Sequence, residues 1–354
     1  MGNLIAIKKG TNPNGKKVMF SAHMDHIGFI VTGFEKEGFL RVTNVGGVSP
    51  DSNQFRHVAF GNGVQGVVVS QPLKPGENRA MKHLFIDIGA QDKAEAEKMV
   101  KLGDVAVYAP NVVRLGEHRV ASPAMDDRSA CAVLLQFLLQ AGTYADTIIG
   151  VFSVQEEVGC RGAKTASFAL APDVGIALDV TAWGDTPEVD QPAVALGKGI
   201  AVKVMDRASI STPALRDQLM GLAEKKNIPY QREVLAFGGT DAGSMQTSRG
   251  GIPVCTLSIP CRYVHSALET VDLRDMEAGV QLMLAYMEER LLEKRVTSKI
   301  YLVVTESNQV AQKLYAGVGY QKVGRLENLY RKGVHELLME KFLSKMTKIG
   351  QRDA

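Results

Sequence analysis

Two adjacent glutamates follow a short apolar run in the stretch Asp146-Thr-Ile-Ile-Gly-Val-Phe-Ser-Val-Gln-Glu-Glu157. Residues 146–153 are rich in β-branched residues and form a run short enough to predict a buried strand. Glu156 and Glu157 would then lie just past the carboxyl end of that strand, where open α/β sheets collect their ligands. The stretch therefore predicts a sheet-centred fold with a functional site at one edge of the sheet.

The segments around this stretch alternate between strand and helix patterns. Such alternation predicts an α/β fold with an open mixed sheet that is flanked by helices. Strands are expected at residues 174–179, 201–204, 231–235 and 254–259, and helices at residues 128–140, 163–169, 211–226 and 276–294.

The beginning of the chain is predicted to form two strands, and a β-rich segment follows them. Residues 4–8 and 18–22 are predicted to be strands joined by the turn-rich hairpin loop 10–15. From residue 28 to about residue 120, short alternating runs are separated by Gly, Asn and Pro, which predicts an inserted β-barrel or sandwich. One helix is expected within it at residues 92–102, with Asp92 as its cap.

A change of charge marks the end of the main unit. Residues 290–354 contain 13 Lys and Arg against 6 Asp and Glu, whereas the whole chain has a formal net charge of +3. A separate strand–helix–strand–helix unit is predicted at residues 299–304, 308–316, 319–326 and 334–343. The expected domains are residues 1–27 with 121–295, the insertion 28–120, and a partial α/β appendage at 296–354.

Composition excludes several classes of protein. Of the 354 residues, 45% are hydrophobic and 22% are charged, which is typical of globular proteins and not of disordered or collagen-like chains. The net charge is too small to favour nucleic acid as a partner, and no apolar run reaches the roughly 18–20 residues that cross a membrane. With no signal-like N-terminus and no CxxC spacing, a cytoplasmic location is expected.

Residues that bind metals gather at the predicted strand ends. Two histidines and several carboxylates that converge from separate strand ends are a typical ligand set for divalent cations. They are His23 and Asp25 after strand 18–22, Asp126 and Asp127 before helix 128–140, Glu156 and Glu157 after strand 146–153, Asp179 in strand 174–179, and His265 after strand 254–259.

The spacing within two motifs indicates distinct roles. Side chains two residues apart in an extended segment lie on one side, so the Asp25 carboxylate is expected to accept a hydrogen bond from the His23 ring. Adjacent Glu156 and Glu157 diverge, so one can bind metal while the other remains free as a general base. Such a set, with one Asp shared, could serve two ions about 3.5–4 Å apart.

Each of these residues also has an ordinary explanation. A lone His near a strand end is usually a core or surface residue, and an Asp-Asp pair at a helix start usually caps the helix. Glu-Glu pairs usually lie on a solvated surface. Asp179 differs, because an unpaired carboxylate within Gly-Ile-Ala-Leu-Asp-Val would be costly to bury. The occurrence of all these features in one chain favours the metal site.

Six motifs in order resemble a known family. Over about residues 3–293 the chain resembles the cocatalytic two-metal aminopeptidases, which include glutamyl and deblocking aminopeptidases and the TET particles. The resemblance implies a sheet of the zinc-peptidase type and removal of N-terminal residues from peptides. The motifs are Ala22-His-Met-Asp25, Met125-Asp-Asp-Arg128, Gln155-Glu-Glu-Val-Gly159, Leu178-Asp-Val-Thr181, Gly238-Gly-Thr-Asp-Ala-Gly243 and Arg262-Tyr-Val-His-Ser266.

The resemblance also implies a ligand set for two divalent cations, usually zinc or cobalt. His23 and Asp179 would hold one ion, and Glu157 and His265 would hold the other. Asp126 would bridge the two ions.

Further expectations follow from the same resemblance. Glu156 would be the general base, Asp25 would orient His23, and Asp127 would follow a cis peptide bond. The inserted β domain would join copies of the chain into a homo-oligomer. The family normally has some tens of residues before the first strand, so a catalytic domain truncated at its N-terminus is expected.

The appendage resembles a different family. Ile300-Tyr-Leu-Val-Val-Thr-Glu-Ser-Asn308 and the pairs Leu314-Tyr315 and Gly319-Tyr320 resemble the C-terminal half of a GNAT acetyltransferase. No Gly-rich turn that could hold the pyrophosphate of acetyl-coenzyme A precedes this segment. The appendage is therefore expected to be a remnant or fusion product without transferase activity.

Other functions stay open at this point. The chain could be an inactive, truncated or fused homologue. It could also be an endoglucanase-type glycoside hydrolase, which needs two carboxylates about 5–9.5 Å apart and no metal. That reading leaves His23 and His265 unexplained, whereas loss of activity on chelation would favour the peptidase.

Overall fold

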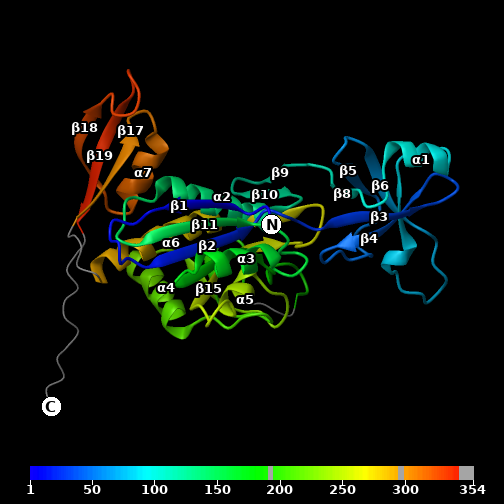
Figure 1. The fold of residues 1–354 in the computed structure, drawn as a ribbon, viewed down its shortest axis with the longest axis horizontal. Helices are drawn as coiled ribbons and strands as arrows, with labels where there is room; N and C mark the ends of the chain where they lie inside the picture. The colour runs from blue at the N-terminus through cyan, green and yellow to red at the C-terminus, as the bar shows by residue number, and fades with distance from the viewer. Residues whose placement is uncertain (190–193, 294–298, 343–354) are drawn as a thin grey trace, which may run out of the picture.

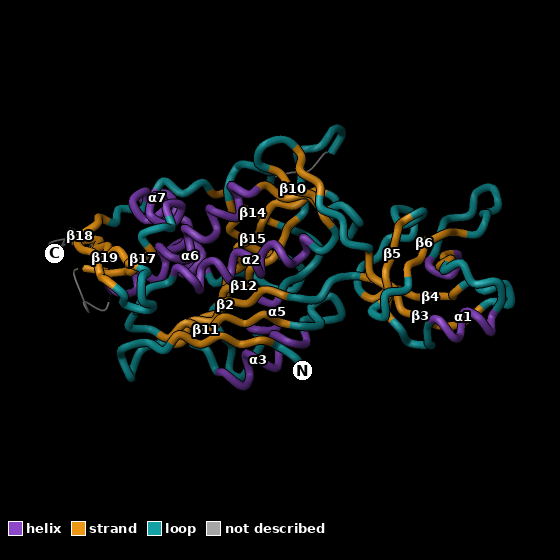
Figure 2. Tube along the Cα trace, turned by 90° about the horizontal axis from the view of Figure 1, so that it is seen from above, coloured by secondary structure: helices purple, strands orange, loops and turns teal. Residues whose placement is uncertain are grey.

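The computed structural model describes residues 1–189, 194–293 and 299–342. An α/β body lies in the middle, a β-barrel projects from one end, and a small C-terminal unit lies beside the other end (Figure 1). Figure 2 shows the same elongated arrangement from above. This confirms the α/β fold with an inserted barrel and a C-terminal appendage that the sequence predicts.

The body is built on a mixed sheet in the order β1-β11-β2-β12-β15-β16-β10-β9, with β13 beside β15 and β14 beside β13. Strands β11, β2, β12 and β15 are parallel, so their carboxyl ends meet at one edge of the sheet. The strands are β1 Leu4–Lys8, β2 Lys17–His23, β9 Val113–Leu115, β10 Arg119–Ser122, β11 Thr147–Ser153, β12 Val174–Thr181, β13 Ile200–Met205, β14 Tyr230–Val234, β15 Val254–Arg262 and β16 Glu269–Asp272.

The first two strands do not form the hairpin that the sequence predicts. β11 lies between them, antiparallel to β1 and parallel to β2. From Ile148 to Ser153 every residue of β11 is buried, whereas β1 is mostly exposed along its length. The more apolar of these two strands therefore takes the inner position, and β1 is left at the edge of the sheet. The hairpin prediction is wrong because burial of β11 outweighs the short loop at residues 10–15.

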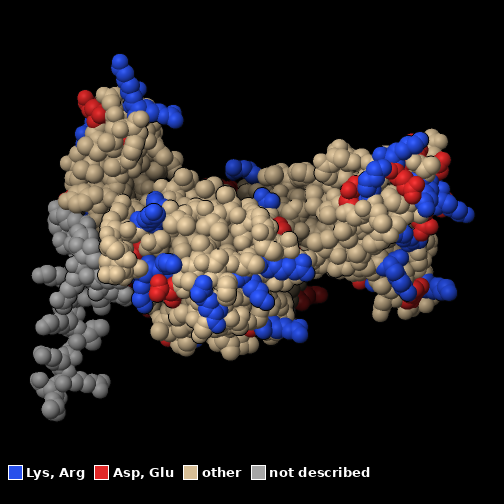
Figure 3. Space-filling model, viewed as in Figure 1, with Lys and Arg blue, Asp and Glu red and all other residues tan. Residues whose placement is uncertain are grey.

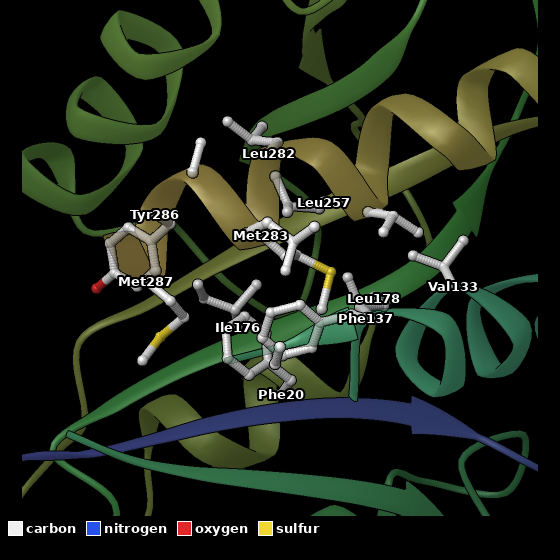
Figure 4. Packing of buried hydrophobic residues seen from close by; sticks show 14 of the residues in the cluster. Phe20, Val133, Phe137, Ile176, Leu178, Leu257, Leu282, Met283, Tyr286 and Met287 are labelled. Carbon is white, nitrogen blue, oxygen red and sulfur yellow. The ribbon is translucent and has the colours of Figure 1, made fainter. Parts of the chain in front are cut away.

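Helices cover both faces of the sheet. Between the sheet and α2, α4 and α6, Phe20 and Ile176 pack with Phe137 and Met283 in the larger core (Figure 4). A smaller cluster, which includes Met245, lies under α3 and α5 on the other face. The helices are α2 Met125–Gln140, α3 Arg161–Leu170, α4 Pro213–Lys226, α5 Asp241–Gln246 and α6 Leu273–Glu293.

The insertion is a closed barrel with its own apolar core, in the order β3-β4-β7-β6-β5-β8. The Asp92 carboxylate accepts a hydrogen bond from the Glu95 amide at 2.8 Å, so Asp92 caps α1 as expected. Because β9 and β10 pair within the large sheet, the barrel ends near residue 108 and not at residue 120. Its elements are β3 Gly28–Phe34, β4 Leu40–Val45, β5 Arg56–Phe60, β6 Gln65–Ser70, the 3-10 helix Met81–His83, β7 Leu84–Asp87, α1 Lys93–Met99 and β8 Val105–Tyr108.

The C-terminal unit is a small antiparallel sheet, β17-β19-β18, with the helix α7. Its elements are β17 Lys299–Thr305, α7 Gln309–Gly317, β18 Gln321–Glu327 and β19 His335–Phe342. Residues 334–343 were expected to be a helix, and this prediction is wrong. Backbone pairing with both neighbours places β19 at the centre of the sheet, and this overrides the helical propensity of its Glu, Leu, Met and Lys residues.

A buried ion pair fastens this unit to the body. The Lys341 ammonium of β19 donates to the Glu288 carboxylate of α6, and both side chains are buried. The Tyr320 hydroxyl donates to the same carboxylate at 3.1 Å. Ile300 and Met339 belong to the same apolar cluster as the body's core. The appendage is therefore packed as part of the fold.

The surface carries charges of both signs. On the face drawn in Figure 3, Lys and Arg side chains are interspersed with Asp and Glu over the barrel. Among the described helices, none combines the length and the apolar character that a membrane crossing requires.

Candidate metal centre

Side chains from separate strand ends converge at the carboxyl edge of the sheet, as the sequence predicts. Candidate ligand atoms lie within 4.8 Å of one another in two adjoining groups. The first group is His23, Asp127 and Asp179, and the second is Asp126, Glu157 and His265. Glu156 lies beside the first group, with Oε2 3.9 Å from Nε2 of His23.

Asp126 belongs to the second group and also contacts the first. Its Oδ1 is 3.0 Å from Nε2 of His23, and its Oδ2 is 3.3 Å from Nε2 of His265. Nε2 of His265 is also 3.4 Å from Oε2 of Glu157. Nε2 of His23 lies 4.0 Å from Oδ1 of Asp179. One carboxylate thus faces both imidazoles. The peptide bond between Asp126 and Asp127 is cis, as expected.

Both imidazoles are oriented by backbone carbonyls. Nδ1 of His23 lies 2.9 Å from the carbonyl oxygen of Asp25, and Nδ1 of His265 lies 2.9 Å from that of Gly47. A carbonyl accepts only, so each Nδ1 carries a proton, and each Nε2 points at the carboxylates and directs its lone pair there whenever the ring is neutral. This arrangement fixes the tautomer that binds metals through Nε2.

The Asp25 carboxylate has a different partner from the one expected. Its Oδ1 is 3.7 Å from Nδ1 of His23, too far for a hydrogen bond. Its two oxygens instead accept from the backbone amides of Glu156 and Glu157, at 3.1 and 3.2 Å. The expected carboxylate–imidazole bond is therefore wrong, because the backbone carbonyl of Asp25 is the partner of Nδ1 and the carboxylate is occupied by the two amides. The carboxylate holds the Glu-Glu turn in place.

Sequence reasoning missed Glu269. This buried carboxylate opens β16 and accepts from the amides of Asp126, at 2.9 Å, and His265, at 2.7 Å. Glu269 therefore fixes the backbone of two members of the second group, Asp126 and His265. A glutamate four positions after His265, at the start of the short run Glu-Thr-Val-Asp272, was the available signal.

Two further residues near Glu156 had no role assigned from the sequence. The Cys160 thiol donates to Oε1 of Glu156 at 2.9 Å. The buried Asp241 carboxylate, from the motif at 238–243, accepts from the hydroxyls of Ser21 and Ser153, both at 2.6 Å. Ser21 and Ser153 lie on neighbouring strands, so Asp241 ties β2 and β11 together beneath the site.

Burial and mutual repulsion perturb the carboxylates. Burial, with Asp241 nearby, raises the pKa of Glu156 to about 7. Burial and the neighbouring Asp126 raise the pKa of Glu157 to about 8. Burial also raises the pKa of Asp179 well above its ordinary value. So many acids in one low-dielectric site are costly to ionise without cations.

The residues present fit divalent cations. Oε1 of Glu157 is buried and has no hydrogen-bond partner among the described residues. Nε2 of His23 and Oδ1 of Asp126 are both acceptors at 3.0 Å, a contact that is repulsive unless a proton or cation lies there. Imidazole nitrogens and carboxylate oxygens are the ligands that zinc and similar ions take.

The fold and this centre define a metallopeptidase. The chain belongs to the M42 glutamyl aminopeptidase family, whose model matches residues 2–282. It is 47% identical over 284 residues to a putative aminopeptidase of Acetivibrio thermocellus, covering 80% of this chain and 85% of that one. It is 39% identical over 301 residues to the lysyl aminopeptidase of Pyrococcus furiosus, covering 82% and 85%.

A solved peptidase structure has a similar fold. The TET1 peptidase of Pyrococcus horikoshii, described as assembling into a tetrahedron or a large octahedral shell, superposes with a TM-score of 0.71. Its sequence is 33% identical, and the match covers 81% of this chain and 87% of that chain. The chain is therefore a peptide hydrolase that acts on N-termini, and the aminopeptidase expectation is confirmed.

Proposed function

We propose that the centre holds two divalent cations, zinc or cobalt, and that Glu156 is the general base of peptide hydrolysis. His23 and Asp179 are the ligands of one ion, and Glu157 and His265 are the ligands of the other. The position of Asp126 carries this proposal, because its two oxygens face the two imidazoles at 3.0 and 3.3 Å. When bound, two such ions polarise a substrate carbonyl and lower the pKa of water.

The side chains around the ions have separate tasks. Oε2 of Glu156 faces the His23 side of the centre, and a carboxylate that is not itself one of the five proposed ligands is free to take and release a proton there. It removes a proton from water and delivers it to the leaving amine. The Asp25 carboxylate positions Glu156 and Glu157 by accepting hydrogen bonds from their backbone amides. This role takes the place of the expected one, in which the carboxylate orients the His23 ring.

Exchange of Glu156 for Gln tests the base. The amide has the same shape but cannot accept the proton, so turnover of an N-terminally free peptide should fall by about 10²–10⁴-fold. Two ions per subunit should remain, because Glu156 is not one of the five ligands. The matched control is Glu97→Gln, an exposed residue of the barrel helix α1. A Glu156→Gln protein with full turnover and full metal content would refute the assignment.

We also propose that the inserted barrel joins copies of this chain into a homo-oligomer. Support comes from the barrel's position, since it projects away from the body and leaves its outer surface uncovered by the rest of the chain (Figure 1). The P. horikoshii TET1 peptidase, which has a similar fold, is described as a shell-forming assembly. Light scattering coupled to size exclusion would show a particle larger than one chain, and a monomer at micromolar concentration would contradict the proposal.

A further inference from the structure

The two carboxylate oxygens of Glu156 face different neighbours. Oε2 lies 3.9 Å from Nε2 of His23, on the side of the two-cation centre. Oε1 lies 2.9 Å from Sγ of Cys160, on the side of α3 and the loop before α5. Glu156 is therefore shared between the catalytic centre and a second polar cluster.

Asp241 completes that second cluster. It is only 2% exposed, and Oδ2 accepts from two serine hydroxyls while Oδ1 has no hydrogen-bond partner among the described residues. Ligand atoms from Glu156, Cys160 and Asp241 all lie within 4.8 Å of one another. A buried carboxylate oxygen without a donor is costly, and a bound cation would remove that cost.

The donor set favours a thiophilic cation. A thiolate with two carboxylates suits Zn²⁺ or Co²⁺, whereas Mg²⁺ and Ca²⁺ prefer oxygen ligands alone. Cys160 is held in place, since its carbonyl accepts from the Ser244 hydroxyl at 3.1 Å and its amide donates to the Glu156 carbonyl at 2.9 Å. The thiol therefore points at Glu156 from a fixed backbone.

We propose that Glu156, Cys160 and Asp241 form a third cation site, separate from the two-cation centre, at which excess Zn²⁺ inhibits the enzyme. Binding replaces the thiol proton, which leaves to solvent, by a zinc–sulfur bond. Burial and the adjacent Glu156 raise the pKa of the Cys160 thiol, so the cation must displace this proton. The third ion also shares Glu156 with the two-cation centre and is repelled by the charge there, so the site fills only when zinc is in excess.

Inhibition follows from the sharing of Glu156, and this consequence rests on the proposed function. With Oε1 bound to a cation, the carboxylate is less basic and is held away from the water it would deprotonate. The third ion would thus block the proton transfer without displacing any of the five ligands of the first two.

The experiment is a titration of the full-length protein with Co²⁺ and with Zn²⁺. For wild type, a third equivalent of Co²⁺ should produce a sulfur-to-cobalt charge-transfer band in the near ultraviolet, and excess Zn²⁺ should inhibit peptide hydrolysis. In Cys160→Ser the band should be absent, and half-inhibition should need at least about tenfold more Zn²⁺, because a hydroxyl is a poor ligand for a soft site. Inhibition is measured relative to each variant's own activity with two equivalents.

Two further variants keep the result interpretable. Asp241→Asn should likewise weaken the binding of the third equivalent of metal. Cys255→Ser, which changes a buried cysteine of β15, should leave the titration as in wild type. Equal inhibition of wild type and Cys160→Ser, or a third equivalent without a thiolate band, would overturn the proposal. Failure of the first two equivalents to bind would instead refute the proposed two-cation centre.

Discussion

Nδ1 of His265 lies 2.9 Å from the carbonyl oxygen of Gly47, so the loop that leaves β4 of the inserted barrel holds an imidazole of the body. A Cβ atom on Gly47 would lie 2.6 Å from that same ring nitrogen. Gly47 is therefore required by close approach to the ring. The barrel and the metal centre share this contact even though most of the barrel lies far from the sheet (Figure 2).

The first prediction concerns Gly47→Ala. The added methyl group would push the His265 ring out of place, so the affinity for the ion on the His265 side should fall by about 10–100-fold, as for other residues that orient metal ligands. The ion on the His23 side should bind as before. Isothermal titration with Zn²⁺ after chelation would resolve the two steps.

Gly61→Ala is the matched control, because a Cβ at Gly61 meets nothing within 4 Å. If Gly47→Ala bound both ions with wild-type affinity, the loop would have no part in orienting His265.

The second prediction concerns the bridging carboxylate. Asp126→Asn keeps the shape of the side chain but removes the charge that the two proposed ions would share. Loss of affinity should therefore exceed the about 10–100-fold typical of residues outside the ligand set, and it should affect both ions. Metal content after dialysis is the measurement, with the exposed Asp217→Asn as control. Selective loss of one ion would show that Asp126 does not bridge.

The third prediction is the pH dependence of the metal-free protein. Burial opposes charge on His265, but Asp126 and Glu157 outweigh it and raise its pKa from 6.5 to about 9. Burial and Asp126 raise the pKa of Glu157 from 4.5 to about 8. Both groups hold a proton more tightly when folded, so the stability they contribute is lost as pH rises, between 4.5 and about 8 for Glu157 and between 6.5 and about 9 for His265.

Thermal melts after chelation should therefore show a falling Tm between about pH 5 and about pH 9. Zinc binds the deprotonated ligands, so the increase in Tm on adding zinc should grow over the same range. A metal-free Tm that climbs steadily with pH would contradict the perturbed pKa values.

The fourth prediction concerns the C-terminal unit. Lys341→Met would leave the Glu288 carboxylate buried without its cation, which should cost about 3–5 kcal/mol of unfolding free energy. Lys322→Met, on the exposed side of β18, should change stability little. Urea denaturation measures both. An unfolding free energy of Lys341→Met close to that of Lys322→Met would mean that the ion pair does not fasten the unit.

The positions of the five proposed ligands could be predicted because they depend on one simple rule. Parallel strands end at the same edge, so His23, Glu157, Asp179 and His265 had to meet once their strands were recognised. Asp126 was expected beside them because it lies at the start of a helix that packs on the same sheet. These positions required no knowledge of side-chain detail.

Contacts that backbone carbonyls make with the two imidazoles could not be predicted. The carbonyl of Asp25, not its carboxylate, reaches the His23 ring, and the two-residue spacing does not distinguish between these two acceptors. Gly47 reaches His265 from a loop 218 positions away in sequence, and no local pattern signals such a contact.

Short apolar segments were ambiguous in the same way. Residues 335–342 fit either a helix or a strand, and only pairing with β17 and β18 decides between them. The place of β1 depended likewise on a partner, β11, that lies far along the chain.

Diffraction at the zinc absorption edge from crystals that hold two equivalents of zinc per chain tests the central claim most directly. The proposed function predicts two anomalous peaks about 3.5–4 Å apart. One should contact His23 and Asp179, the other Glu157 and His265, and both should contact Asp126. A single peak, or peaks bound elsewhere while these side chains stay without metal, would contradict it.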